Sequence, residues 1–308
     1  MTNRGKFYST KRSSQSVAYD PSKIDLGHLS HMYSEDWHLG IIPFNKEKFK
    51  IIVTPETAKA GAINLLKRQG YDDTAETAVE SFLRETTQLM FLDGESMFEI
   101  FKDEKNDKIS LTSIDPKTIE FKGSSAIQTI PEQSRYRSKQ ATIVGSTDSI
   151  FKIEIPDWVE GGKGFIDITK SLKLESNRST IPTKFLGLNN TKQETFFEFD
   201  AFHKQSTIDT LKLTKDSGWD MRRTANTSIT EYYWIHRALK FRTNQARLRE
   251  HIIKKVNCEL LPKVMTLGLR IDSIELTGLR TYKDLLNLQA DLQNGKIGFF
   301  EALDLKKD

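Results

Sequence analysis

The stretch Glu231–Leu261, EYYWIHRALKFRTNQARLREHIIKKVNCELL, decides much of the fold that we expect. It contains neither proline nor glycine, and its apolar residues recur at the period of an amphipathic helix. These residues are Ile235, Leu239, Ala246, Ile253, Val256 and Leu260. The stretch therefore predicts one long helix that ends near Pro262 and packs its apolar stripe against the fold or a neighbouring molecule.

The other side of this helix is basic. Its cations are Arg237, Lys240, Arg242, Arg247, Arg249, Lys254 and Lys255, and the only acid among them is Glu250. Four of them, Arg237, Lys240, Arg247 and Lys254, share the side away from the apolar stripe. We interpret these four as contact residues for nucleic acid or for a neighbouring subunit. The alternative is a solvated face whose long side-chain stems cover apolar surface.

The composition limits the class of protein. A chain of 308 residues holds one large or two ordinary domains, and its net charge of +4 is only mildly basic, so a basic contact must come from local clustering. Cys258 is the only cysteine, which excludes an intrachain disulfide and a cysteine-based zinc site and is typical of a reducing cytoplasm. We interpret Cys258 as a small packing residue. No apolar run is long enough for a membrane span, so we expect no membrane contact.

We expect an α+β fold in four consecutive regions. Residues 1–22 form a basic, serine-rich arm without the apolar segment of a secretory signal, and we expect it to be flexible. Such an arm orders against a neighbour or nucleic acid, or else remains a disordered tail. Residues 23–122 form a region of helices and a β-hairpin, residues 123–217 a β-rich middle region, and residues 218–308 the long basic helix with a C-terminal helical segment.

The clearest local predictions fall in the second region. Ala58–Gln69 is typical of a short helix, with Thr54 before Pro55 as its N-cap and Gly70 as its end. Thr74–Leu92 repeats apolar residues at helical spacing and is ended by Asp93-Gly94.

The next segment, SMFEIFKDEKNDKISLTSI, predicts a β-hairpin with a charged turn around Lys105-Asn106-Asp107. Asp115-Pro116 ends that unit.

The rest of the chain gives weaker patterns. In the middle region IFKIEIPDW is the clearest strand, and TFFEFDAF alternates like a strand before a helix near Ser206–Leu213. Gly218-Trp219 indicates a turn. After the long helix we expect a strand in MTLGLRIDSIEL, a helix over Thr281–Gln293 and a short helical return at the end.

Candidate metal ligands cluster in GHLSHMYSEDWH. They are His28, His31, Glu35, Asp36 and His38. Histidine and carboxylate bind zinc or iron, but this spacing matches no closed metal motif, and the segment lacks a clear helical pattern. We therefore expect a loop or partner contact, with a metal site as the minor alternative.

Candidate catalytic and nucleotide-binding patterns are weaker still. The EGGKGF loop, Glu160–Phe165, lacks the Ser or Thr that follows the lysine of a P-loop, so we interpret it as a turn between strands. Paired carboxylates occur at Asp103/Glu104, in the hairpin turn, and at Glu198/Asp200, in the alternating segment. Both are ordinary for their predicted structure, and no nucleophile–base motif can be assembled. We expect no cofactor, no metal and no enzymatic activity, with an enzyme of unrecognised site as a lesser alternative.

Three segments, taken in order, resemble the portal (head–tail connector, or upper collar) proteins of tailed bacteriophages. The first is FLRETTQLMFLDGESMFEIFKDEKNDKISLTSIDPKTIEF, a helix, a glycine break, a hairpin and an L-x-x-I-D-P-x-x-I line similar to the portal wing. The second is Gly218-Trp219 followed by the long helix ending REHIIKKVNCELLPKVM, which is similar to the stretch around the portal stem. The third is LLNLQADLQNGKIGFFEALDL, similar to portal C-terminal segments. Together they cover about a third of the chain.

The resemblance implies a structural protein of the virion that is assembled in the host cytoplasm and sits at one capsid vertex. It implies a homo-oligomeric ring, usually of twelve subunits, through which double-stranded DNA passes during packaging and ejection. Its partners would be the capsid, scaffold and tail or lower-collar proteins and the packaging motor. In such a ring the cations of the long helix would bridge subunits or touch DNA phosphate without reading sequence. The alternative is a cytoplasmic, sequence-independent nucleic-acid-binding protein that uses the basic helix at residues 231–261.

Overall fold

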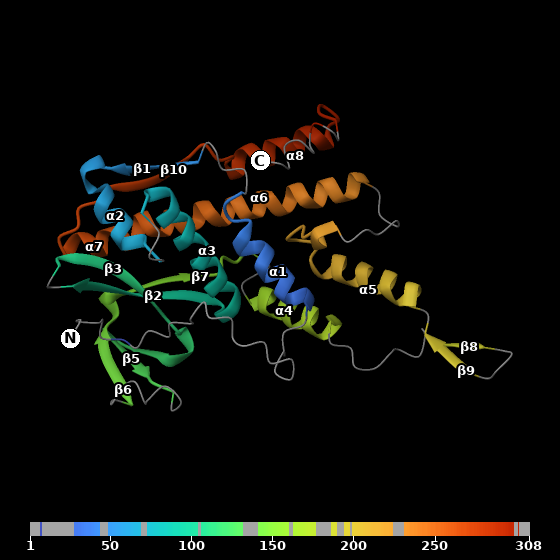
Figure 1. The fold of residues 1–308 in the computed structure, drawn as a ribbon, viewed down its shortest axis with the longest axis horizontal. Coiled ribbons are helices and arrows are strands. Elements are labelled where there is room, and N and C mark those ends of the chain that lie inside the picture. Colours follow the sequence, from blue (N-terminus) through green and yellow to red (C-terminus); the bar gives the residue numbers. More distant parts are fainter. Residues whose placement is uncertain are drawn as a thin grey trace. The chain divides into compact units, whose positions relative to one another are not determined.

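The computed structural model describes residues 7, 28–43, 49–68, 73–103, 106–131, 141–159, 163–176, 186–189, 194–197, 199–223, 231–298 and 301. Helices and strands are both extensive in these residues, which confirms the α+β class (Figure 1). Contacts divide the chain into two units. Unit 1 comprises Met1–Ala18, Trp37–Pro156 and Gln245–Thr281, and unit 2 comprises Tyr19–Asp36, Asp157–Asn244 and Tyr282–Asp308. Each unit is therefore drawn from three separated segments, unlike the consecutive regions expected from the sequence.

The centre of unit 1 is an antiparallel sheet of strand order β3-β2-β7. Strand β2 (Glu95–Asp103) pairs with β3 (Lys108–Ile114), which confirms the predicted hairpin, and with β7 (Ile150–Glu154), the clearest predicted strand of the middle region. Helices α2 (Lys59–Leu66) and α3 (Ala75–Asp93) pack on one face of this sheet (Figure 1). The Phe98 ring of β2 lies 5.5 Å, between centroids, from the Phe82 ring of α3.

Helix α3 begins and ends where its sequence predicts. The Thr74 side chain accepts a hydrogen bond from the Thr77 amide, and the Thr77 side chain accepts one from the Thr74 amide in return. At the other end Gly94 adopts a φ of 87°, the left-handed conformation that glycine reaches without steric cost. Local capping and apolar spacing therefore agree.

Helix α2 differs from its prediction at the start. Thr54 is not its N-cap but the last residue of strand β1 (Lys50–Thr54), where it pairs with Ser273 of β10 (Ser273–Thr277). A 3₁₀ turn, Glu56–Ala58, then precedes α2. The N-cap prediction was wrong because pairing with a strand more than two hundred positions away extends the chain through Thr54. No sequence pattern near Thr54 reports that partner.

A second antiparallel sheet of unit 1 has the order β4-β5-β6. Its strands are β4 (Ile119–Lys122), β5 (Ser125–Thr129) and β6 (Thr142–Ser146). As predicted, Asp115-Pro116 ends the hairpin, and its short turn leads into β4. Phe7 is buried in one cluster with Met97, Ile114 and Ile150 of the first sheet and Ala126 of the second.

Phe7 departs from the expectation of a flexible arm over residues 1–22, and the other residues of that arm lie outside the described residues. It is the residue of that arm that the structure describes, and only 4% of it is exposed. An aromatic ring buries a large apolar area, so burying Phe7 between the two sheets is favourable although its neighbours in sequence are polar.

The long helix is present but does not stop at Pro262. Helix α6 (Glu231–Lys255) passes into a π-helical turn, Val256–Leu260, and then into α7 (Leu261–Thr266). In the widened turn the Leu261 amide bonds to the Val256 carbonyl five positions earlier. A proline ring clashes with the carbonyl four residues before it in a regular helix, and the wider turn relieves that clash. The residues Met265 and Thr266, predicted as strand, are therefore helical, and only Ser273–Thr277 forms the strand.

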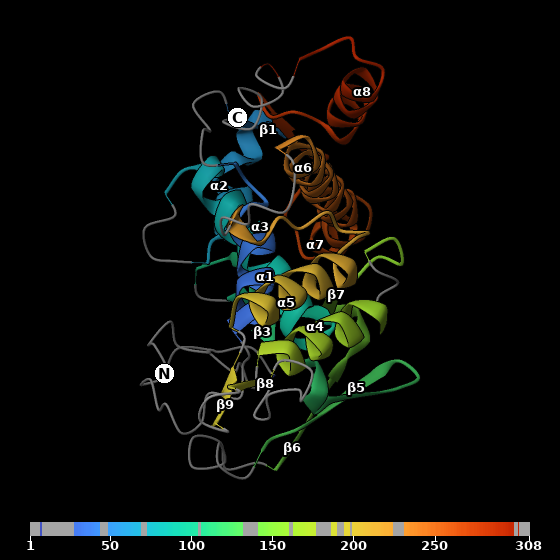
Figure 2. The same cartoon turned by 90° about the vertical axis from the view of Figure 1, so that its right-hand side faces the viewer.

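The described part of unit 2 is mainly helical. It contains most of α1 (His28–Leu39), α4 (Lys163–Ser176), α5 (Phe199–Leu213), the first half of α6 and α8 (Tyr282–Gln293). A small hairpin is formed by β8 (Leu186–Asn189) and β9 (Glu194–Phe197). Helices α4 and α5 lie side by side (Figure 2).

Unit 2 departs furthest from the sequence predictions. Strand alternation in TFFEFDAF ends at Phe197, and Phe199 already begins α5, which is longer than the predicted helix. The β-rich middle region thus contains two helices. The predicted Gly218-Trp219 turn is confirmed, with Gly218 at a φ of 79°, and so is the helix before Asn294-Gly295. Of the predicted C-terminal helical return, Lys296–Gly298 are not helical, Glu301 is helical, and the other residues lie outside the described part of the chain.

Candidate functional site

The predicted contact face of α6 is not a uniform surface. The apolar stripe from Ile235 to Leu260 is buried throughout, as predicted. The four predicted contact cations differ, however. Arg237 is only 4% exposed, Lys240 and Arg247 are partly buried, and Lys254 is exposed.

Arg237 is a buried structural residue of unit 2. Its guanidinium donates to the carbonyl oxygens of Leu211 at 3.1 Å, Thr214 at 2.9 Å and Trp219 at 2.6 and 3.0 Å. It also donates to the hydroxyl oxygens of Thr214 at 2.8 Å and Tyr233 at 3.2 Å. Tyr233 is on α6 itself, and the other acceptors lie at the end of α5 and in the turn that follows it. The expectation that Arg237 faces outward was wrong, because its guanidinium is buried and donates to carbonyl groups at this helix end.

The remaining cations of α6 fall into two groups. Arg249, in unit 1, is 5% exposed and donates to the carbonyl oxygens of Ile41 at 3.0 Å and Arg280 at 2.6 Å. Lys240 donates to the Lys215 carbonyl at 3.1 Å in an exposed position. Contact of Lys240, Arg247 or Lys254 with nucleic acid or a neighbouring subunit therefore stays a prediction, and Arg237 leaves the set.

A second apolar stripe is the signal that would have placed Arg237 correctly. Trp234, Ala238 and Phe241 lie three positions before, one after and four after Arg237, and all are buried. Leu248 and Ile252 continue the buried surface in the next turns. A helix that is apolar on two sides belongs in a core, so an arginine between the stripes is expected to be buried and hydrogen-bonded.

The acidic residues of the predicted metal cluster bind Arg222. Within unit 2, Asp36 accepts from the Trp219 indole at 2.7 Å and from Arg222 Nε at 2.6 Å, while Glu35 accepts from Arg222 at 2.6 Å. The segment is helical, as part of α1, contrary to our reading of it as a loop. Among the described residues, no group of three histidine, cysteine or carboxylate side chains is arranged to hold a metal ion.

The turn that carries Arg222 is strained. Met221 and Arg222 both adopt left-handed backbone conformations, with φ of 55° and 56°, which cost non-glycine residues about 1 kcal/mol or more each. The two ion pairs of Arg222 offset part of that strain. Burial raises the pKa of Asp36, although the hydrogen bonds from Trp219 and Arg222 act in the opposite direction. Burial likewise lowers the pKa of Arg242, a residue of α6 in this unit.

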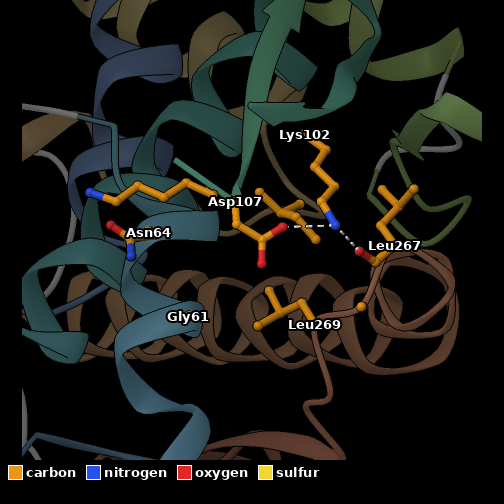
Figure 3. Close-up of a pocket in the computed structure, with 9 residues that line it drawn as sticks. Gly61, Asn64, Lys102, Asp107, Leu267 and Leu269 are labelled. Carbon is orange, nitrogen blue, oxygen red and sulfur yellow. Dashed lines mark hydrogen bonds and ion pairs between the residues drawn. The ribbon is translucent and has the colours of Figure 1, made fainter. Parts of the chain in front are cut away.

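A small pocket in unit 1 lies between the end of the hairpin and the turn after α7 (Figure 3). Its volume is about 200 Å³, and Gly61, Asn64, Ile109 and Leu269 contribute to its lining. The Lys102 ammonium bonds to Asp107 at 2.9 Å and to the Leu267 carbonyl at 2.8 Å (Figure 3). The Lys102 ammonium is therefore already paired with a carboxylate and a carbonyl inside the pocket.

The remaining candidates have structural roles or lie outside the described residues. Lys163 begins helix α4, so the EGGKGF segment is not set between strands as expected, and residues 160–162 are not described. Glu104 and Glu198 are also outside the described residues, so neither carboxylate pair can be assessed. Cys258 is exposed, because the π turn places it nearly half a turn from buried Val256 and Leu260. Its interpretation as a packing residue was wrong.

Comparisons with known proteins give no family. No protein-family model matches the chain, and no curated protein matches its sequence. In the part of the chain that the structure describes, no helix has the length and apolarity needed to cross a membrane. The function must therefore be argued from the chain itself.

Proposed function

We propose that this chain is the subunit of a ring-forming portal protein, a structural connector at a phage capsid vertex that gives passage to DNA. One observation carries the proposal. The segments that resemble portal proteins occur in the expected order, and the described ones form distinct elements: α3, the β2–β3 hairpin, the turn at Asp115-Pro116 and the long helix α6. On this proposal the chain has no enzymatic activity of its own.

The L-x-x-I-D-P-x-x-I line has a clear physical role in unit 1. Leu111 and Ile114 are buried in the hairpin sheet, and the Asp115 side chain accepts from the Lys117 amide at 3.0 Å. Thr118 then donates to the Asp115 carbonyl at 2.7 Å and accepts from the buried Gln128 amide at 3.1 Å. The line joins the β3-β2-β7 sheet to the β4-β5-β6 sheet through these hydrogen bonds.

The second sheet of unit 1 supports assembly with other copies. In the order β4-β5-β6 both β4 and β6 are edges, and β6 carries no charged residue over Thr142–Ser146. Val144 of β6 is 59% exposed and Phe121 of β4 is 44% exposed. Proteins usually protect such edges with charges or cover them, so an uncharged edge with an exposed valine favours a neighbour that covers it.

The mass of the assembly tests the proposal. Native mass spectrometry of the purified chain should give one closed species, near twelve subunits of 35.3 kDa, and negative-stain images should show rings. A stable monomer at high protein concentration would contradict the proposal. An open-ended series of masses would also contradict it, because such a series indicates filaments or aggregation.

The alternative of a nucleic-acid-binding protein loses much of its support. Arg237 and Arg249, two of the cations that made the helix basic, bind carbonyl groups inside their units. The cations left for contact are Lys240, Arg247 and Lys254. Replacing these three with alanine should leave DNA binding and its salt dependence unchanged if the helix is mainly a packing element.

A further inference from the structure

In unit 1, the gap between the first sheet, β3-β2-β7, and the second sheet, β4-β5-β6, is shaped around a single aromatic ring. On the inner face of the second sheet, Ala126 of β5 pairs directly with Gly145 of β6, so the two smallest side chains lie next to each other. A Cβ atom added at Gly145 would lie 2.4 Å from the Phe7 ring, far inside contact distance. The ring therefore occupies the space that any larger residue at position 145 would need.

The first sheet supplies the rest of this gap. Met97, Ile114 and Ile150 belong to the same buried cluster as Phe7 and Ala126. The pairing of Met97 with Ile114, and of Glu99 with Ile150, puts these side chains on the sheet face opposite Phe98 and Phe82. The gap thus has apolar walls from one sheet and a notch of small residues from the other.

One polar contact fixes the backbone of the segment that enters the gap. The Phe7 amide donates to a carboxylate oxygen of Glu99 at 3.2 Å, and Glu99 is only 3% exposed. A carboxylate is costly to bury, and hydrogen bonds from backbone amides lower that cost. The gap therefore recognises two features at once, an aromatic side chain and the backbone N–H of the same residue.

We propose that this gap is a peptide-recognition site whose ligand is the N-terminal segment of the chain, read through Phe7. We name it the Phe7 socket and define it by Met97, Glu99, Ile114, Ala126, Gly145 and Ile150. The socket holds the chain at Phe7, whose neighbours in sequence include the cations Arg4, Lys6, Lys11 and Arg12. The inference rests on unit 1 alone and holds whether or not the chain forms a ring.

Limited trypsin digestion of the full chain tests the tether without changing the cleavage site. Trypsin cuts after Lys6, beside the docked ring. In Gly145→Leu the side chain fills the notch, and cleavage after Lys6 should become at least about tenfold faster, as expected when the docked state loses its contacts. Gly298→Leu is the matched control, because the same change is made where an added Cβ meets nothing within 4 Å. Equal cleavage rates in the folded chain and in folded Gly145→Leu would overturn the proposal.

Binding in trans keeps the test decisive if Gly145→Leu fails to fold. A fluorescent peptide of residues 1–13 should bind the Phe7→Ala chain, and unlabelled peptide should displace it. The fluorescent peptide should not bind the unaltered chain, whose socket is filled by its own Phe7. The same peptide carrying Phe7→Ala should bind at least about tenfold more weakly, since it lacks the ring. Equal binding of the two peptides would show attraction by the cations alone and would reject the socket.

Discussion

The two halves of α6 use the same kind of residue in different ways. In unit 2, Arg237 binds the carbonyl groups of Leu211, Thr214 and Trp219, which lie between 18 and 26 positions earlier in the chain. In unit 1, Arg249 binds the carbonyl groups of Ile41 and Arg280, which lie 208 and 31 positions away. Arg237 closes one neighbouring turn, whereas Arg249 holds together segments that are remote in sequence.

This difference shows what the positive charge of the helix is for. A guanidinium offers five donors in a fixed plane, so it can satisfy several carbonyl groups that no other helix residue could reach together. In the first half of α6, Arg237 closes a short loop of the chain at a small cost in entropy. In the second half, Arg249 closes a long loop. Lys254 of the same helix lies at the surface, and Lys240 and Arg247 are partly buried. The two fully buried cations of α6 in the described residues are thus both arginines, Arg237 and Arg249.

The largest effect should follow Arg237→Ala. The change removes the guanidinium donors of the Leu211, Thr214 and Trp219 carbonyl groups. The Thr214 carbonyl keeps its bonds from the Gly218 amide and the Ser217 hydroxyl. We expect a loss of about 4 kcal/mol in the free energy of unfolding. Arg237→Lys should recover less than half of this, since an ammonium cannot span all three acceptors. Urea denaturation of both variants measures the difference. A loss below about 1 kcal/mol for Arg237→Ala would mean that the hydrogen bonds from Arg237 to these carbonyl groups do not stabilise the fold.

Arg249→Ala should have the next largest effect, about 3 kcal/mol, because it removes the donor of two carbonyl groups, one buried and one partly buried, instead of three. Its matched control is Lys254→Ala, five positions along the same helix and exposed, for which we expect a change within about 0.5 kcal/mol. Urea denaturation again gives both values. If the two variants lost the same free energy, burial would not be what distinguishes the cations of α6.

Gly218→Ala tests how closely the turn must approach α6. Gly218 has a φ of 79°, and an added Cβ would lie 2.8 Å from the Arg237 carbonyl oxygen. Both the strained backbone and this collision oppose the change, so we expect a loss of about 2 kcal/mol. The comparison variant is Gly298→Ala, at a position where an added Cβ meets nothing within 4 Å. Thermal unfolding that ranks Gly298→Ala as the more damaging change would contradict the packing described for the turn.

The parts of the fold that the sequence predicted are those set by neighbouring residues. Thr74 and Gly94 bound α3, and an apolar strand, a charged turn and a return strand specify the hairpin. Capping and strand patterning both act over a few positions. The failures have distant causes. Thr54 is held in β1 by Ser273, and the helix passes Pro262 through a π turn that no local pattern announces.

The candidate site was predicted less well than the fold for a related reason. A single apolar stripe was assigned to α6, so Arg237 was counted as surface although Trp234, Ala238 and Phe241 surround it in sequence. Residue type alone does not show whether a cation contacts solvent or buried carbonyl groups. Phe7 was missed because its partners, Glu99 and Gly145, belong to strands about a hundred positions away. Only the pairing of those strands reveals the socket.

The smallest effect that we predict compares one histidine from each half of α6. Burial, reinforced by Lys240 and Arg237, lowers the pKa of His236, and burial, with Lys255 and Lys254, lowers the pKa of His251. A histidine with a lowered pKa binds its proton more readily in the unfolded chain, so its contribution to stability is complete above about pH 6.5 and is lost as the pH falls below that value. The chain should therefore have a lower urea midpoint at about pH 5.5 than at about pH 7.5. His236→Asn and His251→Asn should each reduce that difference. If the urea midpoint of the unaltered chain instead rose on acidification while that of the variants did not, the histidines would stabilise the fold when protonated, contrary to the prediction.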